Sequence, residues 1–445
     1  MIFFKKLFHP TLLHTYSPLM SMFISPGALC TGRGLLGFSR KSCSTKATDH
    51  HRLLGQPFHH SHPHLLKENE LVPGLSKREF VDRRARFAAR VHESKSDVHH
   101  VVLVPSATVR YMSDKIPYVF RQNTDFLYLT GCQEPESALI MVVRPDGSFH
   151  SLLFVRESNA HAELWEGPRT VSPVKPLIHQ LRLIKSVEEQ KSMADAGVIA
   201  SNAIETAIRL TKPGVTEHQI FATIDYQCRM NGADYLAYPP VVAAGSNATV
   251  IHYINNNQML RDGDLILVDA GCELNGYCSD ITRTWPVNGK FSDAQATLYE
   301  IVLCVQMELL KQCNEYPALD DLFKRMTELL GQRLAEAHVL TKKSKKLKLE
   351  EVAYKLCPHH VGHFLGMDVH DTSTVSRKTP CREGMAITIE PGVYINGSNE
   401  LVQPEFRNIG IRIEDDVLFT SAGPKVLSSV PKSVRDLENL VGRNS

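Results

Sequence analysis

Two acidic residues of this 445-residue chain stand where a strand pattern calls for apolar side chains. Asp269 follows the apolar run 265–268, and Asp280 lies beyond the turn signal Asn275-Gly276. A hairpin folded at the midpoint between the two acids places their carboxylates nearly opposite each other on one face. Two opposed anions in apolar surroundings repel each other unless they share a proton or hold a metal ion. The spacing of this pair leaves both possibilities open.

Two further acids repeat this placement near the end of the chain. Glu390 ends the apolar strand pattern of 386–389, and Glu414 ends that of 410–413. Alternation along the second strand puts Arg412 on the same face as Glu414, where its charge can steady a group of carboxylates. A surface or capping carboxylate would explain any one of these acids, but it does not explain the whole set.

A histidine-rich segment adds donors of a second type. Residues 359–371 contain four histidines among glycines, and His363 is near their centre. Four carboxylates and one histidine suit two divalent cations, such as Mn²⁺, Co²⁺ or Zn²⁺, better than a structural zinc ion. The four negative charges balance two dications, and such a pair lowers the pKa of a shared water to give a nucleophile at neutral pH. The rest of the chain therefore favours metal ions over a shared proton.

The elements that carry these residues make up the second of two predicted domains, residues 181–445. Sequence periodicity and capping boxes predict helices over 186–210, after Thr216 and over 298–310, and strand pairs at 265–270 with 277–285 and at 386–389 with 410–419. Helices that pack on antiparallel hairpins form an α+β layer architecture.

The first predicted domain, residues 71–180, is a smaller, mixed α/β domain. A helix is expected over 75–92. Short apolar runs bounded by turn residues predict strands at 101–104, 119–120, 126–129, 138–143 and 152–155. The Asp146-Gly147 pair predicts a hairpin between the last two of these strands.

The beginning of the chain differs from the rest in composition. Residues 1–48 contain basic residues and no Asp or Glu, which is typical of a mitochondrial transit peptide. A disordered tail is the plainer alternative, and it would leave a cytoplasmic location open. Residues 49–70 are rich in histidine without regular spacing, and they are predicted to be a solvated linker and not a metal site.

The overall composition argues against two classes of function. A net charge of +2 provides no global basic field, so we expect no nucleic-acid partner. The sequence contains no run of eighteen or more apolar residues, so we expect no membrane-spanning helix. Ten cysteines without a C-x-x-C pair indicate reduced thiols in an intracellular protein.

The acidic and histidine segments closely resemble the metallopeptidases of the pita-bread fold, the M24 group. The matching segments are 268–271, 279–287, 359–371, 387–394 and 411–416. The paired histidines and the Glu-Pro-Gly-Val-Tyr segment resemble aminopeptidase P and prolidase more than methionine aminopeptidase. Segments 72–80, 118–137, 163–169 and 237–253 are similar to the mitochondrial branch of the aminopeptidase P group. The resemblance extends from Leu71 to Val417.

The resemblance implies a ligand set for two divalent ions, with Mn²⁺ favoured over Co²⁺ and Zn²⁺. Asp269 resembles the carboxylate that chelates one ion, and Asp280 and Glu414 resemble the bridging pair. His363 and Glu390 resemble the ligands that complete the shell of the other ion. Glu390 is also implied to move a proton from the bridging water.

The resemblance also implies roles around the ions. His252 and His370 resemble the catalytic histidines that contact substrate, and His359 resembles a further catalytic histidine. Tyr394 is expected to bind substrate, and Arg412 resembles the arginine that supports the ligands from behind. Without the resemblance, His252 and His359 would each be interpreted as an ordinary hydrogen-bonded loop histidine.

The implied activity is release of the amino-terminal residue from peptides with proline in second position, by a hydroxide that bridges the two ions. The alternatives are a prolidase that takes Xaa-Pro dipeptides, and a catalytically impaired variant that binds protein. One departure favours the last alternative. Between Trp165 and Leu181 the chain has a short connector where the resembled proteins carry several tens of residues more. The amino-terminal domain is therefore expected to be incomplete, which puts a homodimer and part of the substrate wall in doubt.

Overall fold

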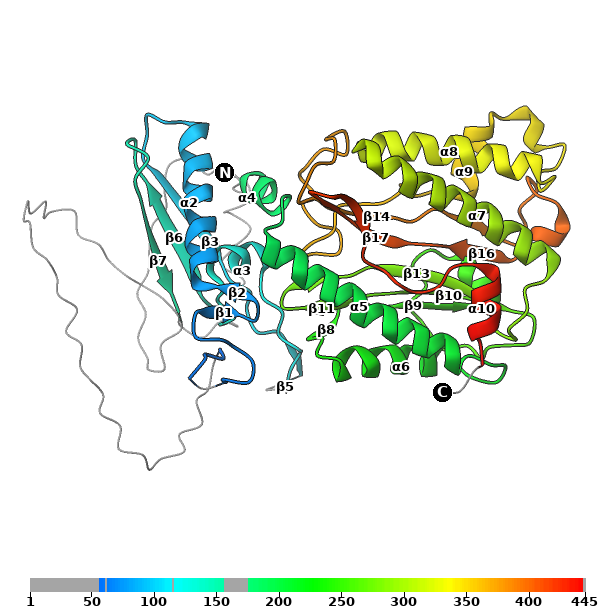
Figure 1. Cartoon of the computed structure of the whole chain (residues 1–445), viewed down its shortest axis with the longest axis horizontal. Helices are drawn as coiled ribbons and strands as arrows, with labels where there is room; N and C mark the ends of the chain where they lie inside the picture. Colours follow the sequence, from blue (N-terminus) through cyan, green and yellow to red (C-terminus); the bar gives the residue numbers. More distant parts are fainter. Residues whose placement is uncertain (1–55, 61, 114–115, 156–174, 443–445) are drawn as a thin grey trace, which may run out of the picture.

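The computed structural model describes residues 56–60, 62–113, 116–155 and 175–442. The predicted transit peptide lies outside these residues, as do parts of the histidine-rich linker and of the short connector. Figure 1 shows a smaller lobe made by the amino-terminal part of the chain beside a larger lobe made by the rest. Within the described ranges, no helix is long and apolar enough to cross a membrane.

The smaller lobe is built on one antiparallel sheet. Its strands β3 (His100–Pro105), β6 (Ala138–Val143) and β7 (Phe149–Phe154) lie in that order. Helix α2 (Lys77–Ser94) begins at Ser76, whose hydroxyl accepts a hydrogen bond from the Glu79 backbone N–H. Phe80 and Phe87 of α2 are completely buried in the core of this lobe. The other described elements of the lobe are β1 (Glu70–Val72), β2 (Leu75–Ser76), β4 (Tyr111–Ser113), β5 (Ile116–Pro117), α3 (Thr124–Thr130) and α4 (Lys175–Arg182).

Two of the strand predictions for this lobe are wrong. Residues 126–129 belong to helix α3, and residues 119–120 lie outside any strand. Helix α3 begins where the Asn123 side chain accepts from the Phe126 N–H and ends at Gly131 in the left-handed conformation. All residues of its apolar run are buried, and a short buried run gives no periodicity that separates helix from strand.

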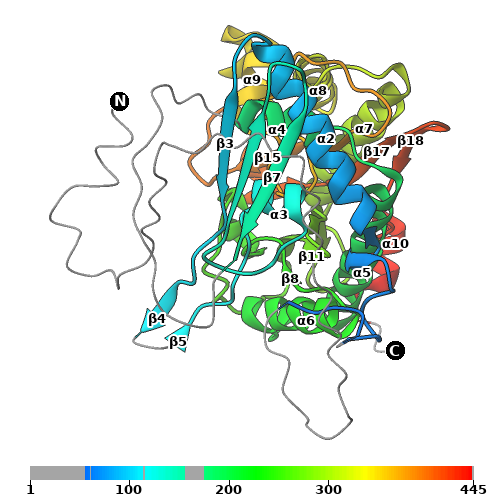
Figure 2. The same cartoon turned by 90° about the vertical axis from the view of Figure 1, so that its left-hand side faces the viewer.

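The outer face of this sheet is apolar and exposed. Leu103 pairs with Ile140, which pairs in turn with Leu152, so the three side chains form a row across the sheet. Leu103 is 57% exposed, Leu152 56% and the neighbouring Val101 61%. In Figure 2, β3 and β7 lie on the side of the molecule turned toward the viewer, with the larger lobe behind them.

We expect this face to drive self-association, because folded monomers seldom expose a contiguous apolar patch. The double substitution Leu103→Lys with Leu152→Glu should make the protein monomeric at concentrations where the unchanged chain is dimeric or larger. Light scattering after size-exclusion chromatography measures this difference. At concentrations low enough for both proteins to be monomeric, the melting temperature of the variant should differ little from that of the unchanged chain, because both side chains are then solvated. An unchanged chain that is monomeric throughout would contradict the prediction.

The larger lobe contains helices on both sides of short antiparallel sheets. In the view of Figure 1, α5 (Val187–Leu210) and α6 (Glu217–Met230) lie on one side of the strands, and α7 (Asp293–Gln312) and α8 (Leu319–Glu336) lie on the other. The predicted capping boxes are confirmed at the start of α6 and α7, and the structure adds one at the start of α5. The remaining helices are α9 (Leu349–Leu356) and α10 (Val434–Leu440).

The strands of this lobe form four small sheets. Their orders are β13-β10-β9, β12-β11-β8, β14-β17-β18 and β15-β16. The strands are β8 (Tyr235–Leu236), β9 (Val241–Ala244), β10 (Leu265–Ala270), β11 (Cys272–Leu274), β12 (Tyr277–Cys278), β13 (Ile281–Pro286), β14 (Ala386–Ile389), β15 (Gly392–Ile395), β16 (Ile409–Arg412), β17 (Asp415–Thr420) and β18 (Gly423–Val426). The expected α+β fold class is confirmed.

The hairpin that carries the first two acids has a register different from the predicted one. Asn275 and Gly276 both have positive φ and form a two-residue turn, which pairs Leu274 with Tyr277. The hairpin therefore folds between residues 275 and 276, and Asp269 pairs with Thr282 instead of Asp280. Residues two apart in a strand share a face, so the two acids remain neighbours on one face, as a diagonal pair.

A glycine allows the two strands of this hairpin to approach each other closely. A Cβ atom on Gly271 would lie 1.7 Å from the backbone oxygen of Ser279, next to Asp280. Any other residue would push this part of the hairpin apart and separate the two acids. The Asp-Ala-Gly segment is therefore restricted by packing as well as by chemistry.

Candidate active site

Three of the predicted ligands converge on one point. Ligand atoms of Asp280, His363 and Glu414 all lie within 4.8 Å of one another. Asp280 lies just before β13, and Glu414 lies at the junction between β16 and β17. His363 comes from the glycine-punctuated segment, and its Nε2 is 3.3 Å from Asp280 Oδ2. Two strand ends and one glycine-punctuated segment therefore supply the donors.

The other two predicted ligands border the same point. Glu390, at the junction of β14 and β15, has Oε1 3.7 Å from His363 Nε2. Asp269, on β10, shares with Asp280 the hydroxyl of Tyr238, which is 2.6 Å from Asp269 Oδ1 and 2.5 Å from Asp280 Oδ1. All five predicted ligands are thus brought together.

Sequence analysis did not identify Tyr238 as a site residue. Its hydroxyl contacts two of the carboxylates, and burial raises its pKa well above the ordinary value, so it stays protonated and can donate. The only sequence signal is its place before Pro239-Pro240 and β9. A tyrosine beside a proline pair does not distinguish a site residue from a packing residue.

Supporting contacts surround the carboxylates. Arg412 donates from Nη2 to Asp269, and Nε donates to the Thr282 hydroxyl at 3.0 Å. The Thr282 hydroxyl in turn donates to Glu414 Oε2 at 2.5 Å. Arg412 is 2% exposed and lies behind the ligands, as the resemblance implies. Arg412 thus holds Asp269 directly and Glu414 through Thr282.

The pKa shifts of the clustered side chains indicate whether these donors are suited to metal ions. Burial, together with the negative charges of Asp280, Glu390 and Asp269, raises the pKa of Glu414 well above its ordinary value. Burial also raises the pKa of Glu390 to about 7, although His363 and Arg412 act against it. Burial would lower the pKa of His363, but the hydrogen bond to Asp280 and the charge of Glu390 raise it to about 9.

These shifts mean that the cluster binds protons when it has no other cations. Four carboxylates lie together in a poorly solvated place with Arg412 as their main fixed positive charge. Divalent cations can replace those protons and satisfy oxygen and imidazole donors at the same time. The residues therefore fit a pair of divalent ions.

His359 and Tyr394 form a chain of hydrogen bonds with Arg412. Arg412 Nη1 donates to the Tyr394 hydroxyl at 2.8 Å, and that hydroxyl lies 2.9 Å from His359 Nε2. His359 Nδ1 lies 2.8 Å from the His360 carbonyl, which can only accept. His359 is therefore a neutral imidazole with its proton on Nδ1, in agreement with burial and Arg412 lowering its pKa to about 4.

The arrangement gives Tyr394 a different immediate task from the expected one. Its hydroxyl is held between Arg412 and His359, and the residue is 7% exposed. It therefore orients His359 and has little surface to offer a substrate directly.

The remaining predicted histidines lie at the open side of the cluster. The ring of His370 packs edge-on against the ring of His363, with 4.3 Å between the centroids. His252 is exposed, and its charge acts on both His359 and His370. His252, His359 and His370 thus border the ligands on the solvent side.

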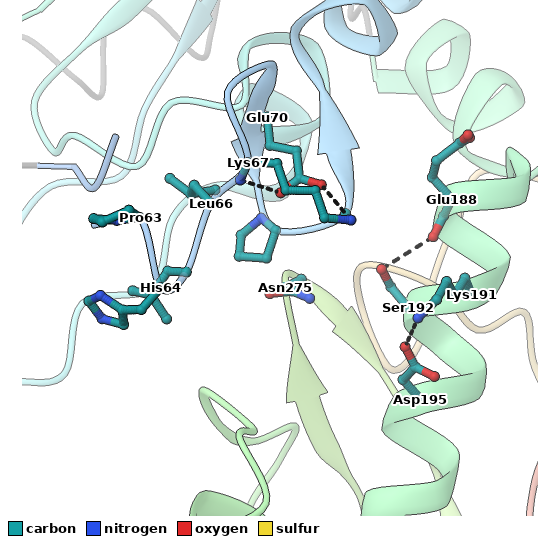
Figure 3. A pocket seen from close by; sticks show the side chains of 13 residues that line it. Pro63, His64, Leu66, Lys67, Glu70, Glu188, Lys191, Ser192, Asp195 and Asn275 are labelled. Atoms are coloured by element: carbon teal, nitrogen blue, oxygen red, sulfur yellow. Dashed lines mark hydrogen bonds and ion pairs between the residues drawn. The ribbon is translucent and has the colours of Figure 1, made fainter. Parts of the chain in front are cut away.

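Two hollows are found outside the ligand cluster. One, of about 800 Å³, is lined by His359 and His360 together with Phe323 and Tyr354, and it adjoins the site. The other, of about 490 Å³, lies between the segment 63–74 and helix α5, near the Asn275 turn (Figure 3). Figure 3 shows that its charged residues pair among themselves, Lys67 with Glu70 and Lys191 with Asp195. None of the metal-ligand candidates lines this second hollow.

Antiparallel hairpins that surround a buried carboxylate and histidine cluster define a metallopeptidase of the pita-bread class. The chain belongs to metallopeptidase family M24: the family described as Metallopeptidase family M24 matches residues 191–421. The family described as Aminopeptidase P, N-terminal domain, matches residues 80–175.

Individual relatives agree with this assignment. The chain is 39% identical to Xaa-Pro aminopeptidase 3 of Rattus norvegicus, over 88% of the chain and 92% of the relative. It is 36% identical to the mitochondrial Intermediate cleaving peptidase 55 of Arabidopsis thaliana, over 91% of the chain and 90% of the relative. A zinc-substituted Escherichia coli aminopeptidase P in complex with product is 29% identical, with a TM-score of 0.73 and 82% and 98% of the two chains covered.

The alignments also bear on the missing segment. The match to the rat protein extends over 465 positions, more than the 445 residues of the whole chain, although only 88% of the chain takes part. The rat protein therefore has residues within the aligned region that this chain lacks. This agrees with an internally shortened chain.

Proposed function

We propose that the protein is a metal-dependent aminopeptidase that releases the amino-terminal residue from peptides with proline in second position. The observation that carries the proposal is the convergence of Asp269, Asp280, His363, Glu390 and Glu414 on one buried site. The relatives that share this architecture are named Xaa-Pro aminopeptidase or aminopeptidase P. Their names favour this activity over that of a prolidase.

The five ligand candidates have a common chemical task. Two divalent ions held by them would lower the pKa of a shared water and supply a nucleophile at neutral pH. Glu390 is the carboxylate with the highest exposure next to His363, and it is placed to take the proton of the attacking water. Mn²⁺ is the ion that we propose, because carboxylate donors outnumber the single imidazole.

The histidines on the open side suit a peptide bond to proline. The nitrogen of such a bond has no hydrogen, so the site must hold the substrate through its carbonyl and its free amine. His252 and His370 are exposed to an incoming peptide. Both ring nitrogens of His359 are already bonded, to the His360 carbonyl and to the Tyr394 hydroxyl. We propose that His252 and His370 contact the substrate around the scissile bond, and that His359 supports the catalytic site beside them.

We also propose a mitochondrial location. The acid-free leader 1–48 and the mitochondrial relatives support it. A homodimer is proposed as well, and the exposed apolar row of the small lobe supports it.

The activity test compares substrates and metals. Hydrolysis of a Xaa-Pro-Yaa tripeptide is expected with added Mn²⁺ and is expected to stop with a chelator, whereas a Xaa-Pro dipeptide should be cleaved at most weakly. Parallel reactions with Co²⁺ and Zn²⁺ rank the three ions by the rate of tripeptide hydrolysis that each supports. Faster cleavage of the dipeptide would instead identify a prolidase. A chain that binds metal but cleaves neither substrate would be the impaired, protein-binding variant.

A further inference from the structure

A buried group of charges fixes the segment that carries His370. Arg182, the last residue of α4, is 2% exposed, and its Nη2 donates to Asp368 Oδ2 at 2.7 Å and also to Asp371. Lys185 Nζ lies 3.2 Å from the other carboxylate oxygen of Asp371. Two aspartates that flank His370 in sequence are therefore both held by the same guanidinium.

The same guanidinium also reaches the smaller lobe. Its Nη1 donates to Asp125 Oδ1 at 2.7 Å and to the Thr124 hydroxyl at 3.0 Å, both in the first turn of α3. The Thr124 hydroxyl donates in turn to Asp368 Oδ2 at 3.0 Å. Arg121, just before α3, donates to the Met367 carbonyl at 2.9 Å. The segment 366–371 is thus tied to the smaller lobe by side chains on both of its halves.

The fit around these charges is close. A Cβ atom on Gly366 would lie 2.4 Å from Asp371 Oδ2 and 3.0 Å from Lys185 Cε. Lys185 and Asp371 have side chains that are 1% and 0% exposed. Buried ion pairs contribute little net stability compared with apolar packing, but removing one partner leaves an uncompensated buried charge. Such a network is suited to specify one arrangement of the segment.

We propose that Arg182 is a positioning residue for the peptidase reaction, which holds segment 366–371 so that His370 stays against His363. Through Thr124 and Asp125 it makes that placement depend on the docking of the smaller lobe. The proposal rests on the proposed function, because it assigns His370 a part in the reaction. Arg182 has no contact with the ligand cluster and acts only through Asp368 and Asp371.

The first test is Arg182→Gln in the full-length, metal-loaded protein. We expect kcat on a Xaa-Pro-Yaa peptide to fall by about tenfold to a hundredfold, since a displacement of about 1 Å can cost a hundredfold. KM should change less, and two ions per chain should remain bound. Arg182→Lys keeps the positive charge but loses the forked guanidinium. Its kcat should therefore lie between that of the unchanged enzyme and that of Arg182→Gln. If Arg182→Gln does not fold, Arg182→Lys tests the proposal in its place.

A matched control is Arg83→Gln. Arg83 is equally buried and bridges the lobes by pairing with Glu189 of α5 at 3.3 Å, but it does not touch segment 366–371. Its loss should lower the melting temperature and change kcat by less than about twofold, measured well below the melting temperature of every variant. An equal fall of kcat in Arg83→Gln would show a general effect of lobe docking and would overturn the proposal.

The decisive test places Arg182→Gln on a His370→Ala background. If Arg182 acts through His370, the second substitution should lower kcat by less than about twofold further. The proposal would be overturned if the double variant lost kcat by the product of the two single losses. It would also be overturned by an unchanged kcat in Arg182→Gln or by full activity of His370→Ala. Failure of the proposed function is a separate result, because it would be seen as an inactive unsubstituted enzyme with its metal bound.

Discussion

Replacing Asp280 by Asn, or Glu414 by Gln, is expected to abolish activity on Xaa-Pro-Yaa peptides and to prevent binding of the ion pair. Both acids are buried, and their oxygens lie with His363 Nε2 within one 4.8 Å group. A carboxamide has nearly the same shape but cannot balance the charge of a cation or bridge two ions. We expect kcat/KM to fall at least about a thousandfold, which corresponds to roughly 4 kcal/mol.

Stability separates this loss from misfolding. In the metal-free protein Glu414 is crowded by three other carboxylates, so the neutral Gln should not lower the melting temperature. The unsubstituted chain should gain stability on adding metal, because binding favours the folded state, whereas the variant should gain little. Inductively coupled plasma mass spectrometry of the unsubstituted chain and the variant measures the metal content per chain and completes the test.

A matched control is Glu189→Gln. Glu189 is a buried carboxylate that closes the capping box of α5 and pairs with Arg83, outside the ligand cluster. This variant should lose stability and keep its metal. Near-normal turnover and full metal content in Glu414→Gln would contradict the dinuclear assignment.

Replacing His370 by Ala is expected to remove most of kcat while both metal ions remain. The ring of His370 packs against His363, but His370 is outside the group of atoms that can share an ion, and it is exposed to solvent. Loss of one hydrogen bond made in the transition state costs roughly 2–4 kcal/mol. Steady-state kinetics and metal analysis of the same preparation measure both quantities.

The control for this variant is His218→Ala. His218 is an exposed histidine of α6 that stacks on Phe221 and lies outside the site. It should leave kcat unchanged. If His370→Ala lost one of its two ions, His370 would have to be reassigned as a metal ligand.

The ligand candidates and the helices of the larger lobe could be predicted because their signals are local. A capping box depends on residues three apart, as in Ser292 and Gln295, and it forms whatever lies around it. An acid after an apolar strand, such as Glu390, is visible as a break in composition. The Asn275-Gly276 turn identifies a hairpin because few other pairs adopt positive φ at both positions.

The errors arose where local signals were weak. The run 126–129 looked like a strand, but the Asn123 cap and Gly131 make it a helix buried between the lobes. The hairpin register differs from the predicted one because the Asn275-Gly276 turn sets it, and this turn does not place the two acids directly opposite each other. Tyr238 was missed because its importance comes from partners 31 and 42 residues away.

The sequence by itself determined which side chains are available for metal chemistry and on which strand ends they lie, because composition and spacing along one strand encode both. The tertiary structure alone decided that side chains as far apart in sequence as Asp280 and Glu414 meet at one buried point. It also decided that Arg182, which the predicted domain boundary assigns to the second domain, lies between α3 and the His370 segment. Contacts of this kind are fixed by packing and by the burial of charge, which depend on the whole chain and leave no periodic mark in the sequence.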